Sequence, residues 1–439
     1  MTITLNKLKK ARFCCLMLFF FLILFIKSFH AIDIPQMFVL AIAVILPFCF
    51  SPQEIAAYIA CFSMLGTGIQ IAYVCMACII SLFVKTKMQL KMIQIIVPAI
   101  FLCNELIRIA IYPEDELIEA IRYVIVFFLI IYILSSDLSQ NDRRKIVDAC
   151  IFSTAFVVIL VLIETLSLSE WNMSSLLNGS LRLGYSQQLN GALYFSADPN
   201  MLGQSCSLAI SLCLMLISSE GVKMKYLIAM AICLLGGTLT ISKTFFLSLV
   251  VIFLLVLFGT GTKNNALKSL LQKCGFLVLV VLLVFVVYKV NPSYIENLLS
   301  RVDYSDVTTG RTENAMVYIE ALSSDAIGLL FGKGMQNVGD KVGFTGSPHA
   351  ATVEMIVCWG VVGTVIIGGL LIYATYWHAK NKNVCFLNFI PILVFACVVQ
   401  TTQLFRLRDH VLCLIVVIVT CGLELGKDKK YEKKSTICY

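Results

Sequence analysis

The chain has 439 residues, of which 59% are hydrophobic and only 14% are charged. Soluble globular domains carry about 25% charged residues, so this composition excludes an ordinary soluble protein. The net charge of +8 does not indicate nucleic-acid binding, because the basic residues stand in short clusters between long apolar runs. These runs recur along the whole chain and predict an all-α, polytopic membrane protein that forms one domain over residues 1–439.

The N-terminal segment has the charge pattern of a signal peptide. Lys7, Lys9, Lys10 and Arg12 precede an apolar run over residues 13–26. No small-residue cleavage site follows that run, so we expect a retained first span.

The basic clusters predict the topology. If every long apolar run crosses the membrane once, the clusters all fall on one side, which the positive-inside rule makes cytoplasmic. They are Lys85/Lys87/Lys91, Arg143/Arg144/Lys145, Lys223/Lys225, Lys263/Lys268/Lys273, Lys380/Lys382 and residues 427–434. Residues 13–84 divide into four short crossings, which gives about 14 spans, or about 12 if two of those segments do not cross. Both termini are then cytoplasmic.

Two long polar segments fall on the opposite, exterior side. They are a first loop, residues 168–199, and a large loop, residues 291–348, in which we expect short helices. The chain has 18 cysteines, yet neither loop contains one, so disulfides are not expected in the exposed structure. Cys75 and Cys78 form a CxxC within an apolar run. A redox or metal site is one interpretation, and small apolar packing is the favoured one.

Ionisable residues also occur inside apolar runs, where a charge is costly unless it is paired or functional. Glu105 and Arg108 are three residues apart, as are Glu119 and Arg122, so each pair can meet on one helix face. Structural ion pairs are the favoured interpretation, and substrate contact is the alternative.

The first loop carries Arg182 and ends in Asp198-Pro199-Asn200, directly before an apolar run. A helix N-cap explains Asn200, but it does not explain Arg182, for which a solvated surface arginine is the alternative to a binding role. Lys243 stands at the exterior end of a tight turn between two apolar runs. Its ammonium group either snorkels to the membrane interface or binds a lipid-linked phosphate.

The large loop carries a second set of candidate residues. Arg301, Arg311 and Glu313 lie within it, and His349 opens the next apolar run. A histidine at a helix start usually caps the helix or lies at an interface, but the two upstream arginines favour a functional role.

These residues form an ordered set that resembles the O-antigen polymerase and O-antigen ligase superfamily of bacterial envelope glycosyltransferases. The resemblance covers roughly residues 182–371, and hydropathy alone supports the rest. The matching segments are Arg182-Leu183-Gly184, Asp198-Pro199-Asn200, Ser242-Lys243-Thr244, Gly310-Arg311-Thr312, Gly332-Lys333-Gly334, His349-Ala350-Ala351-Thr352-Val353 and Gly360-Val361-Val362-Gly363. Two positions depart from the family pattern. Ala350 replaces the usual Asn after the histidine, and Lys243 stands where ligases typically have Arg, which favours a polymerase.

The resemblance implies a GT-C-like fold and glycosyl transfer from undecaprenyl-pyrophosphate-linked oligosaccharides at the periplasmic face of the bacterial inner membrane, in lipopolysaccharide biosynthesis. It also implies that neither a metal nor another cofactor takes part, and that a chain-length regulator is a possible partner protein. In keeping with this, the exterior loops contain no Asp-x-Asp and no His/Asp/Glu cluster at metal-ligand spacing.

Roles for single residues follow from the same resemblance. Arg182, Lys243, Arg301 and Arg311 would hold the pyrophosphate and stabilise the charge of the leaving group. His349 would act as the catalytic base on the acceptor hydroxyl, and Arg311 would be the second catalytic residue. In supporting roles, Glu313 would orient Arg311 or contact sugar hydroxyls, and Asn200 would help to form the site.

The charge of the large loop bears on the choice of acceptor. It has four basic and seven acidic residues, and thus a net charge of −3, which would repel a phosphate-rich acceptor such as lipid A-core. A polymerase, whose acceptor is another lipid-linked repeat unit, is therefore favoured over a ligase. A flippase for the same lipid-linked units is a third interpretation, but inverted repeats and short loops would mark a transporter, and neither is found in this sequence.

Overall fold

The computed structural model describes residues 15, 18–19, 21–30, 32, 34–35, 41, 71–86, 90–191, 193–195, 198–259, 288–289, 291–300, 311–344, 350–380, 384–401 and 411–425. Every regular element within these ranges is an α-helix or a short 3-10 helix. The all-α prediction is therefore confirmed for this part of the chain.

Among the described residues, five helices are long and apolar enough to cross a membrane. They are α5 (Met92–Ile111), α6 (Leu117–Leu134), α7 (Gln140–Leu168), α9 (Pro199–Glu220) and α17 (Ala351–Ala379). Shorter elements are α4 (Ile71–Thr86), α10 (Met224–Leu239), α11 (Lys243–Gly259), η2 (Phe386–Phe389), α18 (Ile390–Val398), η3 (Val399–Thr401) and α20 (Cys413–Thr420). The expected total of about 12–14 spans involves segments outside the described residues and stays a prediction.

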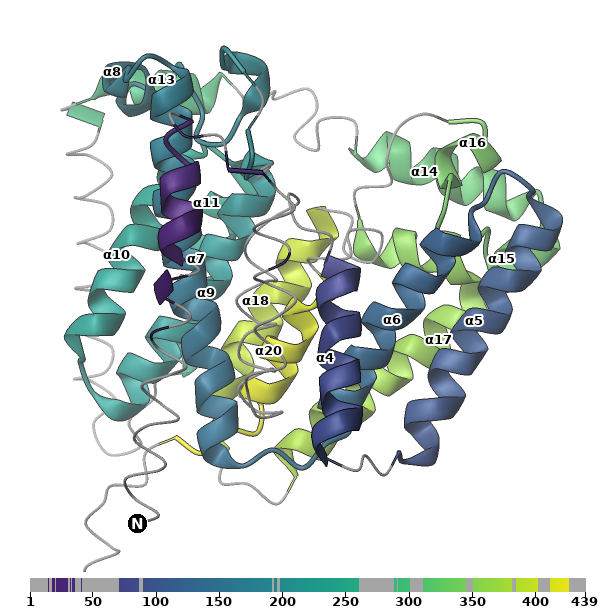
Figure 1. Ribbon diagram of the computed structural model, residues 1–439. Helices are drawn as coiled ribbons and strands as arrows, with labels where there is room; N and C mark the ends of the chain where they lie inside the picture. The colour runs from purple at the N-terminus through teal and green to yellow at the C-terminus, as the bar shows by residue number, and fades with distance from the viewer. Residues whose placement is uncertain are drawn as a thin grey trace, which may run out of the picture.

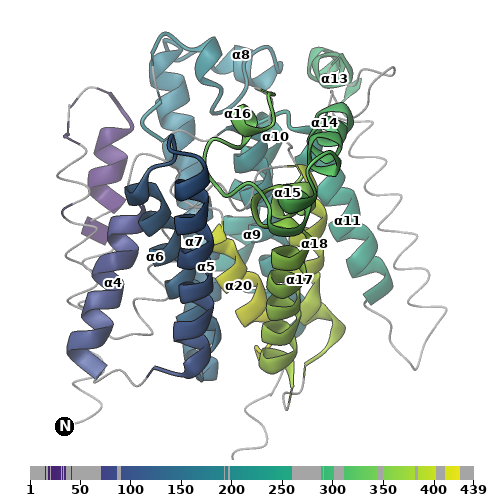
Figure 2. The same ribbon diagram turned by 90° about the vertical axis from the view of Figure 1, so that its right-hand side faces the viewer.

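The long helices run side by side in one bundle (Figure 1, Figure 2). Helix α9 is central, in contact with α7, α10, α11 and α18. Small side chains explain how it packs so closely. Gly203 lies against Ser242 and Phe245, and the Ser207 hydroxyl bonds to the hydroxyl of Ser248 on α11.

One end of the bundle, here called the basic end, gathers residues that the sequence assigns to the cytoplasmic side. The ring of His378, near the end of α17, is buried there. Its Nδ1 accepts a hydrogen bond from Arg143 at 2.7 Å, and its Nε2 donates to the Leu134 carbonyl at 2.9 Å. Arg144 forms an ion pair with Glu220. These contacts join the ends of α6, α7, α9 and α17.

The opposite end, here called the loop end, carries the two long polar segments (Figure 1). Their helices are α8 (Met173–Leu177), η1 (Ser186–Gln188), α13 (Pro292–Leu299), α14 (Arg311–Ser323), α15 (Ala326–Phe331) and α16 (Val338–Lys341). The Asn291 side chain donates to the Leu177 carbonyl at 2.6 Å, and that of Asn297 donates to the Asn178 carbonyl at 2.8 Å. The two predicted exterior loops therefore contact each other at one end of the bundle.

The two predicted ion pairs within helices have different outcomes. Glu119 and Arg122 form an ion pair on α6. No ion-pair contact joins Glu105 to Arg108, although both residues are described. Arg108 donates instead to the Phe331 carbonyl at 2.8 Å, which ties α5 to the large loop.

Candidate functional site

The Arg182 segment of the first loop is held against the turn between α10 and α11. The Nε of Arg182 donates to the Thr240 carbonyl at 3.0 Å, and the Leu183 amide donates to the Leu239 carbonyl at 2.9 Å. The guanidinium group lies over the ring of Tyr185, 5.0 Å from its centroid. Because backbone and side chain are both fixed, the guanidinium has a defined position at the loop end.

Asn200 faces the same turn from the first turn of α9. Asp198, and not Asn200, is the N-cap of this helix, since its carboxylate accepts from the Asn200 amide at 2.7 Å. The N-cap explanation of Asn200 is therefore wrong. Its side-chain oxygen accepts a hydrogen bond of 3.1 Å from the hydroxyl of Ser242, the residue before Lys243.

The turn itself places Lys243 at the start of α11. Thr240 ends α10, and Ile241 has a φ of 48°, which reverses the chain within two residues. The ammonium nitrogen of Lys243 is shielded from solvent, as is one guanidinium nitrogen of Arg182. On the far side of the turn, the Thr244 hydroxyl lies 3.1 Å from that of Thr401, so α11 is fixed against η3.

A polar pocket of about 300 Å³ opens beside Arg182. Its lining combines one guanidinium, one tyrosine ring with its hydroxyl, two side-chain amides and two serine hydroxyls, the groups that bind phosphate and sugar hydroxyls. The lining residues are Gly179, Ser180, Arg182, Tyr185, Gln188, Asn297 and Ser300.

Helix α13 brings the large loop to this pocket. The Tyr294 hydroxyl donates to the Thr238 carbonyl at 2.7 Å, and burial raises the pKa of Tyr294 to about 12. That anchor places Asn297 and Ser300 on the pocket wall. Ser300 directly precedes Arg301 in the chain.

A second cluster lies where the large loop meets α17. Helix α17 is broken at Gly360, whose φ of 67° and ψ of −175° are not helical. The break frees carbonyl groups that an unbroken helix would use internally. The Lys333 amide donates to the Val357 carbonyl at 2.7 Å, and the Gly334 amide donates to the Cys358 carbonyl at 3.0 Å.

Glycine is required on both sides of this junction. Gly332 has a φ of 77°, and a Cβ there would overlap the carbonyl group of Cys358. A Cβ on Gly360 would overlap the carbonyl group of Leu330. Two motifs that are separate in the sequence therefore meet in one backbone contact. One is Gly332-Lys333-Gly334, and the other contains Gly360.

Charged side chains fix the same region to the hairpin between α5 and α6. Lys341 forms an ion pair with Asp115, and their side chains are 1% and 0% exposed. Lys333 forms an ion pair with Asp325. The Gly328 amide and the Lys333 ammonium lower the pKa of Asp325. Burial by itself would lower the pKa of Lys333, but hydrogen bonds to Asp325 and Tyr112 outweigh burial and raise it.

The structure thus brings together Arg182, Asn200 and the turn that carries Lys243. Arg311 begins α14, which Figure 1 shows on the other side of the loop end from α8 and α13, and Glu313 is exposed in the first turn of that helix. Predictions for Arg301, for His349 and for the side chain of Arg311 lie outside the described residues.

Sequence reasoning missed the pocket residues Tyr185, Gln188 and Asn297, because they converge from two loops and form no motif. It also missed a partly buried contact between the His30 Nε2 and the Glu164 carboxylate, 2.9 Å apart. The signal for that contact was an acidic residue inside an apolar run. Glu164 also accepts from the Phe195 amide at 3.2 Å, so it anchors the end of the first loop.

Comparisons with protein-family models, with curated protein sequences and with solved structures found no match to this chain. Within the described part of the chain, no group of three or more His, Cys, Asp or Glu side chains is arranged to hold a metal ion. Cys75 and Cys78 are both fully buried in α4.

Proposed function

We propose that this chain is an O-antigen polymerase, a glycosyltransferase that joins undecaprenyl-pyrophosphate-linked oligosaccharide repeat units. The observation that carries the proposal is that Arg182, which lines a polar pocket, and Asn200 both bond to the turn that carries Lys243. These are three elements of the motif set on which the family resemblance rests. We further propose that the chain crosses the inner membrane about 12–14 times, with both termini in the cytoplasm and the loop end at the periplasmic face. The proposed partner protein is a chain-length regulator.

In the proposed reaction, Arg182 and Lys243 bind the pyrophosphate of the donor. The acceptor hydroxyl oxygen attacks the anomeric carbon from the face opposite the pyrophosphate, and the bond from that carbon to the phosphate oxygen breaks. The electron pair of that bond leaves with undecaprenyl pyrophosphate, whose growing negative charge the two cations stabilise. His349 takes the hydroxyl proton, and the anomeric centre is inverted.

The lining of the pocket suits a sugar next to a phosphate. The ring of Tyr185 offers an apolar face for a pyranose, and the amides of Gln188 and Asn297 both donate and accept hydrogen bonds. Arg301 directly follows the pocket residue Ser300 and supplies further positive charge in the proposed site. The proposal also includes Arg311, which would reach the donor from the start of α14 on the other side of the loop end.

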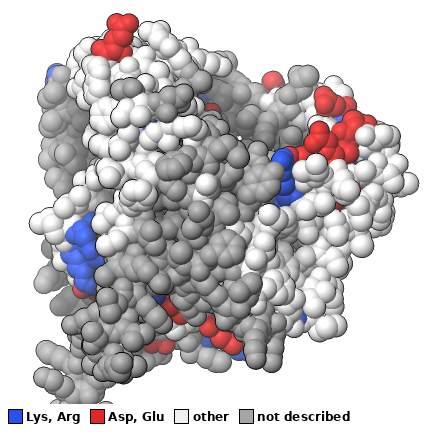
Figure 3. All heavy atoms as spheres, viewed as in Figure 1, with Lys and Arg blue, Asp and Glu red and all other residues white. Residues whose placement is uncertain are grey.

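The choice of acceptor rests on charge. Figure 3 shows acidic side chains gathered on the part of the loop end formed by the α5–α6 hairpin and the large loop. Exposed acidic residues there include Glu114, Glu116 and Asp340. This surface disfavours the phosphate-rich lipid A-core that a ligase would use, and it accepts a largely neutral oligosaccharide. An O-antigen ligase remains the second candidate, and a flippase the third.

Lipopolysaccharide from a strain that lacks the gene for this chain tests the proposal. A single band of core plus one repeat unit is expected. Bare core would favour a ligase or a flippase, and an unchanged ladder would contradict all three. When the gene is returned to this strain with the change Arg182→Ala, the lipopolysaccharide should still carry only short chains. The gene with Asn172→Ala, a change in the same loop but outside the pocket, should restore the full ladder.

A further inference from the structure

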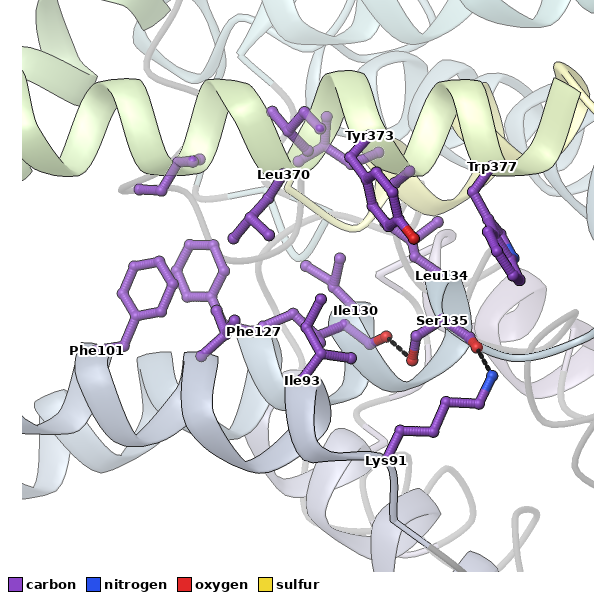
Figure 4. Close-up of a pocket in the computed structure, with 16 residues that line it drawn as sticks. Lys91, Ile93, Phe101, Phe127, Ile130, Leu134, Ser135, Leu370, Tyr373 and Trp377 are labelled. Carbon is purple, nitrogen blue, oxygen red and sulfur yellow. Dashed lines mark hydrogen bonds between the residues drawn. The ribbon is translucent and has the colours of Figure 1, made fainter. Parts of the chain in front are cut away.

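A second cavity, of about 310 Å³, lies between α5, α6 and α17 (Figure 4). Its wall is almost entirely apolar, with Phe101, Phe127, Ile130 and Leu370 among the side chains that face into it. Such a cavity between candidate membrane spans is suited to hydrocarbon.

The length of the cavity matches one leaflet of a bilayer. Along α5 the lining runs from Lys91 to Phe101, and along α17 from Trp377 back to Ile367. Ten residues of helix rise about 15 Å, which is half of a hydrocarbon core of about 30 Å. A single acyl chain of one leaflet therefore fits, whereas a polyprenyl chain is much longer than the cavity.

The polar groups of the cavity all lie at its basic end. Lys91 is exposed at the start of α5 and donates to the Ser135 carbonyl at 2.6 Å, which leaves two of its three ammonium hydrogens for another acceptor. Opposite it, Trp377 lines the cavity, and the Lys380 ammonium lies 4.7 Å from its ring centroid. Two cations beside an aromatic residue are typical of the level at which lipid headgroups lie.

We propose that this cavity binds one acyl chain of an anionic phospholipid from the leaflet at the basic end, with the lipid phosphate between Lys91 and Lys380. An anionic lipid is favoured because a zwitterionic headgroup carries its own cation, which the two lysines would repel. The start of α5 adds the positive end of a helix dipole to the same place. The site is independent of the proposed glycosyl transfer, since Arg182 and Lys243 lie at the opposite end of the bundle.

Tryptophan quenching by brominated lipids tests the proposal on the full chain reconstituted into phosphatidylcholine vesicles. Trp171→Phe removes an indole that is 57% exposed at the loop end. The remaining tryptophans both report on the cavity, because Trp377 lines it and Trp359 packs on Phe101 at 5.5 Å. We measure the mole fraction of brominated lipid at which quenching reaches half of its maximum. This fraction should be about fivefold lower for brominated phosphatidylglycerol than for brominated phosphatidylcholine.

Lys91→Gln should raise that fraction for phosphatidylglycerol about two- to threefold, because Lys380 keeps part of the preference. Lys145→Gln is the matched control, a cation at the same end that does not line the cavity, and it should change nothing. Ala374→Phe should fill the cavity and weaken quenching by both lipids. Equal quenching by the two lipids in the parent protein would overturn the proposal, as would an equal effect of the two lysine variants or full quenching in Ala374→Phe.

Discussion

The backbone amide of Gly334 donates a 3.0 Å hydrogen bond to the carbonyl of Cys358, a carbonyl that the break at Gly360 releases from its own helix. Together with the bond from Lys333 to Val357, it joins the large loop to α17 through main-chain atoms. The segments that carry Arg311 and His349 flank this junction in the chain. Its geometry should therefore control both the stability of the loop end and the proposed chemistry.

Gly360→Ala should destabilise the protein by more than about 2 kcal/mol, because a backbone conformation of this kind is strained for any residue with a Cβ. The added methyl would also overlap the Leu330 carbonyl group. Thermal unfolding in detergent measures the effect. Gly368→Ala, on the same helix with nothing within 4 Å of the new Cβ, is the control and should not lower stability. Equal behaviour of the two variants would contradict the role given to the break.

The buried ion pair of Asp115 and Lys341 predicts a strongly coupled double-mutant cycle. Asp115→Asn or Lys341→Met alone should cost about 3–5 kcal/mol, because each leaves an uncompensated buried charge. The double variant Asp115→Leu/Lys341→Met should recover most of that loss. Free energies of unfolding in denaturant measure the cycle, and additive losses would show that the two side chains do not depend on each other.

The ion pair of Asp325 and Lys333 predicts a pH-dependent contribution to stability. The pKa of Asp325 is lowered in the folded protein, so its contribution is present above the unfolded pKa of about 3.9 and is lost as the pH falls through the folded pKa. At pH 7 the Asp325→Asn variant should therefore unfold at a lower temperature than the parent. This difference in unfolding temperature, here called the gap, should disappear as the pH falls below about 4. Asp340→Asn, an exposed change in the same loop, should show no gap. A gap of constant size across this pH range would argue against the pair.

The proposed topology predicts which end of the bundle a membrane-impermeant thiol reagent reaches in intact cells. In a background without exposed native cysteines, a cysteine at Ser324 should be labelled from the periplasm, because this residue is exposed at the loop end. A cysteine at Val222, which is 70% exposed at the basic end, should be labelled only after the cells are opened. The reverse pattern would place the proposed site in the cytoplasm.

His349→Ala should lower turnover by about a hundred- to ten-thousand-fold, the usual cost of removing a general base. Binding of the lipid-linked donor should persist, because other residues hold the pyrophosphate in the proposed mechanism. Purified protein, donor and acceptor separate the two quantities. Loss of donor binding together with turnover would assign His349 to holding the loop, and normal turnover would assign the deprotonation to another group.

Hydropathy was sufficient to predict the all-helical structure, because it depends on the length and spacing of apolar runs. Helix spacing predicted the Glu119–Arg122 pair, but the same spacing also predicted a Glu105–Arg108 pair that does not form. The contact between the two loops was not predicted. The partners of Asn200 and Arg108 were not predictable in the same way. Asn200 bonds to Ser242, 42 residues away, and Arg108 bonds to Phe331, 223 residues away. Such contacts depend on how helices pack, and a single sequence does not encode that packing in any local pattern.

The junction at Gly360 has a consequence for how such a protein can diverge. Its hydrogen bonds and close approaches use backbone atoms, so the side chains at Val357 and Cys358 can be exchanged without removing a hydrogen bond of the junction. Selection would then act on the glycines and on very little around them. Two proteins that descend from one ancestor could therefore keep this backbone contact between the large loop and α17 after most of their residues have diverged.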